Sequence, residues 1–217
     1  METAILLYDK FTALDCIGPY EVLSNLPGTD VKFVSRDGGL IRADSGRLAI
    51  MTDYSIDDVP SPAIVLVPGG PGDQAAGADA RICAWLRKAH ETTKWTTSVC
   101  TGSIILASAG LLDGLEATTH WASYDRLAAR GAKPVARRVV RQGKIITAAG
   151  VSSGIDMALE LARLEQGDEV AQAIQLGIEY DPDPPFDSGS PDKAPPQIVE
   201  LLRAHFASLE RAGAAVE

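Results

Sequence analysis

The chain has 217 residues, 46% of them hydrophobic, which suits the core of a single α/β domain spanning residues 1–217. Its formal net charge of −9 argues against binding to nucleic acid or to an anionic membrane surface. The N-terminal apolar run is too short for a signal peptide, no run reaches the roughly 18 residues of a membrane span, and three cysteines make no disulfide framework. We therefore expect a reduced, cytoplasmic protein.

The first half of the chain alternates strand patterns with helical ones. Strands are predicted at residues 4–8, 31–35 and 64–67, with short strand-like pieces at 40–52. Residues 15–26 are predicted as a loop followed by a short helix, with Gly18 and Pro19 near the helix start, where proline is tolerated. Apolar residues that recur on one face predict a helix at 79–90.

The second half continues this alternation. A strand at 96–99 leads into a helix that ends at Ala109 and is capped by Gly110, two strands flank Gly143 within 137–147, and helices are predicted at 155–164 and 171–180. The Pro- and Asp-rich segment 181–196 is expected to be an ordered loop anchored by Phe186, before an amphipathic helix at 197–211. The whole pattern predicts an α/β fold with a mostly parallel sheet and helices on both faces.

Cys100 is the leading candidate for a catalytic residue. It lies between the predicted strand 96–99 and a helix-forming run, with Gly102 in the turn. Such an elbow presents a nucleophile at the edge of a sheet. The N–H groups at the helix start are expected to favour the thiolate, which is the reactive form. The alternative is a buried, inert cysteine, which is how we interpret Cys16 and Cys83.

Asp15 is the second candidate. It follows the first predicted strand and is flanked by the apolar residues Leu14 and Cys16. A carboxyl group in an apolar setting tends to stay protonated and so can give a proton near neutral pH, which would place a general acid beside a nucleophile. The alternative is that Asp15 caps the helix at Gly18 and Pro19. From the residues alone both interpretations stand.

Glycine-rich junctions follow two other predicted strands. Gly69 and Gly70 come directly after the strand at 64–67, and Gly150 follows the strand pair within 137–147. Sites in parallel sheets lie beyond the carboxyl ends of the strands, so both junctions are expected beside Cys100. The N–H groups of Gly69 and Gly70 are expected to face developing negative charge.

The histidines give little support to other chemistries. His90, His120 and His205 are isolated, and no Cys-x-x-Cys or His-x-x-x-His spacing exists, so no metal site is expected. Phosphate-binding and dinucleotide-binding glycine motifs are also missing from the sequence. His120 is the one candidate base for a Cys–His pair.

Several segments carry a resemblance to a known family. They are residues 14–15 with 18–22, 68–70, 99–103, 117–121, 149–158 and 180–191. Through them the chain resembles, over essentially its whole length, the ThiJ/PfpI superfamily of flavodoxin-like proteins, and within it the isocyanide hydratases. The cysteine elbow recurs across the superfamily, whereas Asp15 combined with Cys100-Thr101 and the loop at 184–191 is more specific.

This resemblance implies hydration of an isocyanide to an N-substituted formamide, without a cofactor, in a homodimer. It implies Cys100 as the nucleophile, Asp15 as the acid/base group and Thr101 as a hydroxyl near the sulfur. The residues expected to line the substrate site are Gly69, Gly70, His120, Trp121 and Val151.

Three alternatives remain open. Relatives with glyoxalase or deglycase activity on α-oxoaldehydes generally carry Glu where this chain has Asp15. Sensor domains of AraC-type regulators are closely similar but are joined to a basic DNA-binding region, which this acidic chain does not show, so a DNA-binding role is not expected. A redox-sensing or chaperone protein would use oxidation of Cys100 in place of catalysis.

Overall fold

The computed structural model describes residues 1–214, and the chain divides into two compact units, the first comprising residues 1–180 and the second beginning at residue 181. The single domain over 1–217 stays a prediction, and its last three residues lie outside the described range. Within that range, none of the helices combines the length and the apolar character needed to cross a membrane.

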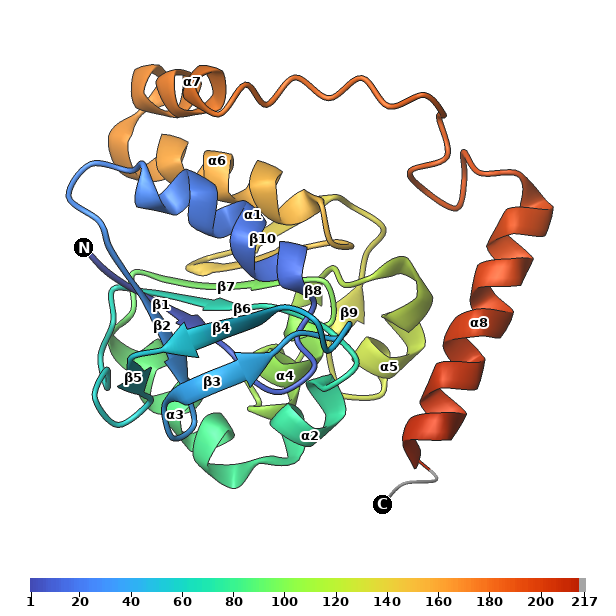
Figure 1. Cartoon of the computed structure of the whole chain (residues 1–217), viewed down its shortest axis with the longest axis horizontal. Coiled ribbons are helices and arrows are strands. Elements are labelled where there is room, and N and C mark those ends of the chain that lie inside the picture. The colour runs from blue at the N-terminus through green and yellow to red at the C-terminus, as the bar shows by residue number, and fades with distance from the viewer. Residues whose placement is uncertain (215–217) are drawn as a thin grey trace. The chain divides into compact units, whose positions relative to one another are not determined.

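A seven-stranded sheet forms the centre of the first unit (Figure 1). Each neighbouring pair of strands is parallel except the pair at the β10 edge, which is antiparallel. All predicted strands are present with small shifts at their ends, and β5 is an addition that the sequence pattern missed. In spatial order the strands are β10 (Val139–Gln142), β11 (Ile145–Ala148), β7 (Trp95–Val99), β6 (Ile64–Val67), β1 (Glu2–Leu6), β2 (Asp30–Ser35) and β5 (Tyr54–Ser55).

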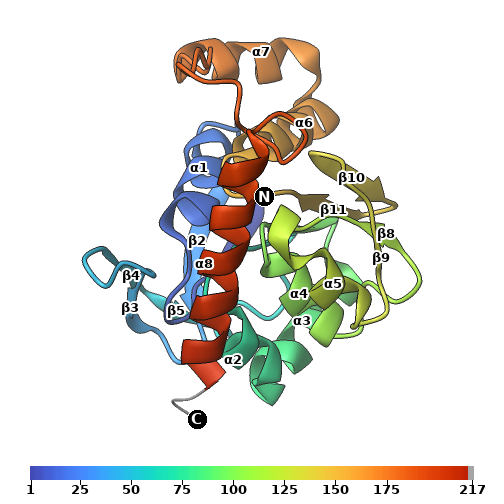
Figure 2. The ribbon, with the colours of Figure 1, turned by 90° about the vertical axis from the view of Figure 1, so that its right-hand side faces the viewer.

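Helices cover both faces of this sheet (Figures 1 and 2). One face carries α1 (Ala13–Ser24) and α6 (Ser153–Gln166), with α7 (Asp168–Gly177) packed outside α6. The other face carries α2 (Asp73–Ala78), α3 (Ala80–Thr92) and α4 (Gly102–Ser108), with α5 (Tyr124–Ala128) against α4. The predicted helices are confirmed, although α7 ends earlier than expected, and α2 and α5 were not predicted.

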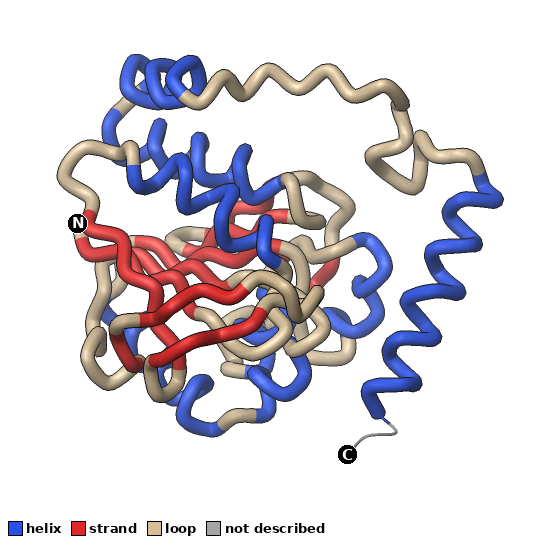
Figure 3. The backbone as a smooth tube through the Cα atoms, viewed as in Figure 1, coloured by secondary structure: helices blue, strands red, loops and turns tan. Residues whose placement is uncertain are grey.

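Smaller elements complete the first unit, and Figure 3 shows them among the loops. An antiparallel hairpin, β3 (Gly39–Arg42) with β4 (Ala49–Thr52), accounts for the strand-like pieces predicted at 40–52. A second pair joins β8 (Glu116–Ala117) to β9 (Lys133–Pro134), and the 3₁₀ turn η1 (Trp121–Ser123) precedes α5.

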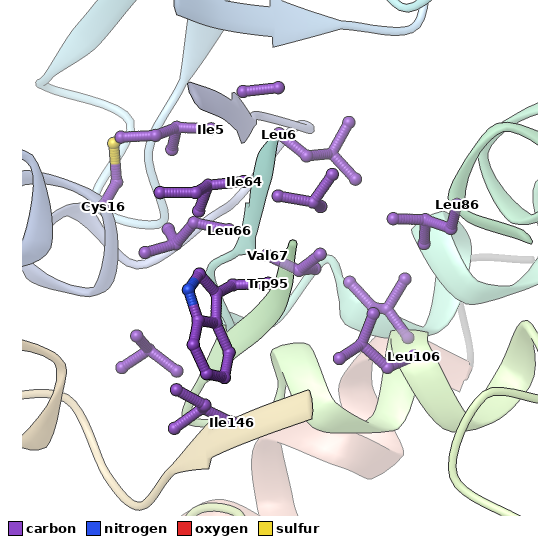
Figure 4. Packing of buried hydrophobic residues seen from close by; sticks show 14 of the residues in the cluster. Ile5, Leu6, Cys16, Ile64, Leu66, Val67, Leu86, Trp95, Leu106 and Ile146 are labelled. Carbon is purple, nitrogen blue, oxygen red and sulfur yellow. The ribbon is translucent and has the colours of Figure 1, made fainter. Parts of the chain in front are cut away.

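Apolar side chains from both faces of the strands and from the helices that cover them make up the core (Figure 4). All four side chains of β6 are buried, which is the burial expected of a strand covered on both faces. Cys16 of α1 and Cys83 of α3 are both buried in the core, as predicted for structural cysteines.

The structure corrects the prediction around Pro19. Helix α1 begins at Ala13, so Asp15 lies in its first turn and Pro19 lies inside the helix. The φ of proline suits a helix. Because proline has no N–H, the helix lacks one backbone hydrogen bond, the one that would end on the carbonyl of Asp15. Close packing on α6 stabilises this arrangement, since a Cβ added to Gly154 would lie 2.9 Å from Pro19 Cγ.

The second unit consists of a loop and one helix. Helix α8 (Pro196–Ala214) confirms the helix predicted at 197–211. The preceding residues 181–195 form neither helix nor strand, and within them Lys193 pairs with Asp187 at 2.7 Å. The anchoring role of Phe186 stays a prediction.

Candidate active site at Cys100

Cys100 lies in the turn between β7 and α4, as the strand–turn–helix pattern predicted. Its φ of +56° is in the left-handed region, which residues other than glycine rarely adopt. Its N–H donates to the carbonyls of Ala148 and Ala149 at 3.1 and 2.9 Å, and its carbonyl accepts the hydroxyl of Thr119 at 3.0 Å. These bonds fix the backbone and leave a side chain that is 6% exposed.

The sulfur of Cys100 receives two backbone hydrogen bonds, from the N–H groups of Thr101 and Val151. Burial, which is the largest effect, and the charge of Asp15 nevertheless raise the pKa of the thiol well above its ordinary value. The N–H of Thr101 at the helix start lowers the pKa of the thiol, as expected, but burial and Asp15 outweigh it, so the expected preference for the thiolate is wrong. Helix α4 has only seven residues, and its effect on the sulfur is smaller than that of burial.

Asp15 is completely buried and points from α1 toward the same place. Its Oδ2 accepts the N–H of Gly69 at 2.9 Å. Its Oδ1 is buried and receives no N–H or O–H donor from the described residues, while the carboxyl group interacts with the thiol of Cys100. Burial raises the pKa of Asp15 to about 7, against the lowering effect of its bonds to Gly69 and Cys100. The apolar-carboxyl interpretation is supported, and the helix-cap interpretation is wrong.

The loop between β6 and α2 joins these groups. Gly69 has no room for a side chain, because an added Cβ would lie 2.4 Å from the nitrogen of Thr101 and 2.9 Å from Asp15 Oδ2. The N–H of Gly70 donates to Thr101 Oγ1 at 3.0 Å. The expectation that both glycines present N–H groups to developing charge needs correction, because Asp15 and Thr101 already accept these bonds.

His120 and Trp121 follow Thr119, whose hydroxyl holds their segment on Cys100. The ring of His120 packs on Gly150, where an added Cβ would lie 2.9 Å from its Cδ2. Burial lowers the pKa of His120, and its Nδ1 accepts the N–H of Ala122 at 3.4 Å. The rings of His120 and Trp121 are 5.5 Å apart between centroids.

The structure thus brings Asp15, Gly69, Cys100, Thr101 and the backbone of Val151 into one buried cluster. His120 borders it through Gly150. Two cavities of about 420 and 470 Å³ lie elsewhere, the first against α6 and α7 and the second against α1 and α7. No group of three or more His, Cys, Asp or Glu side chains in the described part of the chain is placed to hold a metal ion.

Sequence reasoning missed two polar contacts close to the cluster. The hydroxyl of Tyr8 donates to the carbonyl of Pro68 at 2.8 Å. Asp73, at the start of α2, pairs with Arg126 of α5 at 2.6 Å. Tyr8 was assigned only to a strand, and nothing in the spacing of Asp73 and Arg126 connects them.

Comparison with known proteins assigns this chain to a family. The profile of the DJ-1/PfpI family matches residues 1–164. This chain belongs to the DJ-1/PfpI family. The family and the flavodoxin-like fold implied by the sequence resemblance are thereby confirmed.

Two similar sequences and one similar crystal structure extend this comparison. An isonitrile hydratase of Pseudomonas putida is 42% identical over 207 residues, covering 95% of this chain and 90% of that protein. The crystal structure of a ThiJ/PfpI family protein from Pseudomonas syringae matches with a TM-score of 0.93 and 36% identity over 99% of this chain and 89% of that one. An HTH-type transcriptional regulator of Pseudomonas aeruginosa is 31% identical over 186 residues, which cover 81% of this chain but 50% of the regulator.

Proposed function

We propose that this protein hydrates isocyanides to N-substituted formamides, with Cys100 as the nucleophile and Asp15 as the acid/base group. The observation that carries the proposal is the buried Asp15 carboxyl, whose pKa is raised to about 7, interacting with the buried thiol of Cys100. The 42% identical relative from Pseudomonas putida supports the substrate class, because isonitrile is another name for isocyanide.

The access to the sulfur suits such a substrate. An isocyanide presents its electrophilic carbon at the end of a narrow, linear group, and a soft thiolate is a good match for that carbon. Cys100 is 6% exposed, so a narrow group approaching end-on can reach its sulfur more easily than a branched group. Gly69, Gly70, His120, Trp121 and Val151 are proposed to surround the bound substrate.

The first step uses the single proton that Asp15 and Cys100 share. The proton first moves from Cys100 to Asp15. The resulting thiolate forms a bond to the terminal carbon, and the proton passes from Asp15 to the same carbon, which gives a thioimidate. Gly69 holds Oδ2 of the carboxyl at 2.9 Å, so Oδ1 is the oxygen available for proton transfer. No charge is left on the substrate, and Asp15 becomes a carboxylate.

The second step adds water. The oxygen of water attacks the thioimidate carbon while the Asp15 carboxylate takes a proton from that water. Asp15 then gives this proton to the substrate nitrogen. The carbon–sulfur bond then breaks, the hydroxyl proton goes back to the pair, and the formamide leaves. Thr101 is proposed to position these groups through its N–H on the sulfur and its hydroxyl on Gly70.

The test is ultraviolet-monitored turnover of an aromatic isocyanide, with Cys100→Ala and Asp15→Asn as variants. Turnover by the parent protein and a loss of at least about a hundredfold in both variants is expected, as for removal of a nucleophile or of a general acid/base. Methylglyoxal serves as the comparison substrate. Turnover of methylglyoxal without turnover of several isocyanides would overturn the proposal and favour an α-oxoaldehyde enzyme.

The assembly implied by the resemblance is also a proposal. We propose a homodimer of the 22.9 kDa chain, and sedimentation velocity at micromolar concentration checks it. A species of the monomer mass alone would contradict it. A cytoplasmic location stays a prediction.

A further inference from the structure

A single peptide group connects Tyr8 to Asp15. The hydroxyl of Tyr8 donates to the carbonyl of Pro68 at 2.8 Å. The N–H of the same peptide group belongs to Gly69 and donates to Asp15 Oδ2 at 2.9 Å. Both hydrogen bonds are buried, so neither competes with bulk water.

Hydrogen bonds on the two ends of one peptide group strengthen each other. A donor on the carbonyl oxygen increases the charge separation along the amide, which makes the N–H a stronger donor. A stronger donor to a carboxylate favours its charged form over its protonated form. The arrangement therefore carries an effect from the Tyr8 hydroxyl to the Asp15 carboxyl without direct contact between the two side chains.

We propose that Tyr8 is a positioning residue that acts through the Pro68–Gly69 peptide group to hold Asp15 and make its carboxyl more acidic. The proposal rests on the proposed function of Asp15 as the acid/base group. In that role Tyr8 sets the pH at which Asp15 and Cys100 together reach the state with one proton.

Tyr8 acts as a neutral donor throughout the working range. Burial, followed by the charges of nearby acidic groups, raises its pKa well above the ordinary value. The titratable and charged groups that influence Tyr8 are Asp73, Asp15, Cys100 and Arg126. The groups that shift the pKa of Asp15, besides the Gly69 N–H, are Cys100 and Asp44. The charge of Asp15 in turn raises the pKa values of Cys16 and Tyr8.

The next peptide group provides an internal control. There the N–H of Thr12 donates to the carbonyl of Gly69 at 2.8 Å, and the N–H of Gly70 donates to Thr101 Oγ1 at 3.0 Å. Tyr8 makes no bond to this second peptide in the structure of the described residues. An effect carried by hydrogen bonding from Tyr8 should therefore reach the amide of Gly69 and spare that of Gly70.

The experiment compares the full-length protein with its Tyr8→Phe variant by NMR. The carboxyl ¹³C signal of Asp15, assigned with Asp15→Asn, is titrated from pH 5 to 9. We expect the Asp15 midpoint to rise by about half a pH unit, as for a hydrogen bond weakened by 10–30%. The ¹H signal of the Gly69 amide should move upfield while that of Gly70 stays in place. Tyr20→Phe, which alters a tyrosine of α1 that packs on Phe33, is the matched control.

An unchanged Asp15 midpoint, or equal movement of the Gly69 and Gly70 signals, would overturn the proposal. The titration needs no substrate, so its result is separate from the success or failure of isocyanide turnover. If Tyr8→Phe does not fold, 3-fluorotyrosine at position 8 gives the opposite test. Its more acidic hydroxyl should lower the Asp15 midpoint, and a rise or no change would reject the role of Tyr8.

Discussion

Asp15 and Cys100 control each other's protonation. The charge of Asp15 raises the pKa of the thiol, and the hydrogen bond from the thiol lowers the pKa of the carboxyl. Two groups coupled in this way titrate as a pair, with a first proton leaving near pH 7 and a second only at much higher pH. Between these limits the pair holds one proton, which rests mainly on Cys100, and its transfer to Asp15 gives the thiolate and the acid of the proposed mechanism.

The pH dependence of catalysis follows from this pair. Below pH 7 both groups are protonated and no thiolate forms, so kcat/KM for an isocyanide should rise with pH through an apparent pKa of about 7. Initial rates between pH 5.5 and 9 with a substrate that does not ionise measure this limb. A constant kcat/KM across that range would contradict the shared-proton mechanism.

Asp15→Asn should stabilise the protein at alkaline pH while abolishing turnover. The pKa of Asp15 is higher in the folded chain than its ordinary value of 3.8, so ionisation opposes folding. The penalty is absent below pH 3.8 and complete above about 7, where it reaches an upper value of about 4 kcal/mol.

Urea unfolding of the parent and of Asp15→Asn at pH 4.5 and pH 8 measures this difference. The gain in unfolding free energy from Asn should be larger at pH 8. Asp187→Asn, at an exposed carboxyl, should show no such dependence. An Asn variant that is less stable than the parent at pH 8 would show that ionisation of Asp15 does not destabilise the folded protein.

Gly69→Ala should damage both stability and activity. An added Cβ would lie 2.4 Å from the backbone nitrogen of Thr101, so the loop or the turn at Cys100 must move. A loss of about 1–3 kcal/mol is expected for overpacking of this kind. Gly177→Ala is the control, because nothing lies within 4 Å of its added Cβ. Thermal denaturation and turnover of the two variants test the difference.

The hydroxyl of Thr101 should matter more than its methyl group. Thr101→Val removes the acceptor for the Gly70 N–H, whereas Thr101→Ser keeps it. Loss of a buried hydrogen-bond partner costs about 1–3 kcal/mol of unfolding free energy, so stability should fall by about that amount in Val and little in Ser, and kcat/KM should fall in Val only. Equal values in the two variants would assign the hydroxyl no part in the site.

His120 should be dispensable for the chemistry. Asn at position 120 can still accept the N–H of Ala122 and cannot serve as a base at neutral pH. His120→Asn is expected to keep kcat within about tenfold of the parent value, whereas loss of a general base costs about 100-fold or more. A larger loss, with disappearance of the rise near pH 7, would restore the Cys–His pair as the catalytic unit.

Local patterns were sufficient to predict most of the fold. The apolar run of β6 and the turn after it depend on neighbouring residues alone, and both are present as expected. The start of α1 was placed too late, because Gly18 and Pro19 normally mark a helix boundary. Their small or fixed shapes instead serve the close packing of α1 on α6, which the sequence of α1 does not reveal.

The candidate site was only partly predictable. Cys100 and Asp15 could be selected from their positions after two strands, but the direction of the thiol pKa could not. That direction depends on how completely the folded chain excludes water from both groups. The bond of Tyr8 to Pro68 joins residues 60 positions apart, and no periodicity along the chain encodes it.

The left-handed backbone at residue 100 sets the proposed nucleophile against the thermal stability of the fold. A φ of +56° costs a residue with a side chain about 1–2 kcal/mol and costs glycine almost nothing. Cys100→Gly should therefore unfold at a higher temperature than Cys100→Ala. In a library of variants selected for heat resistance alone, glycine should accumulate at this position, and the selected variants would lack the proposed nucleophile while folding more stably.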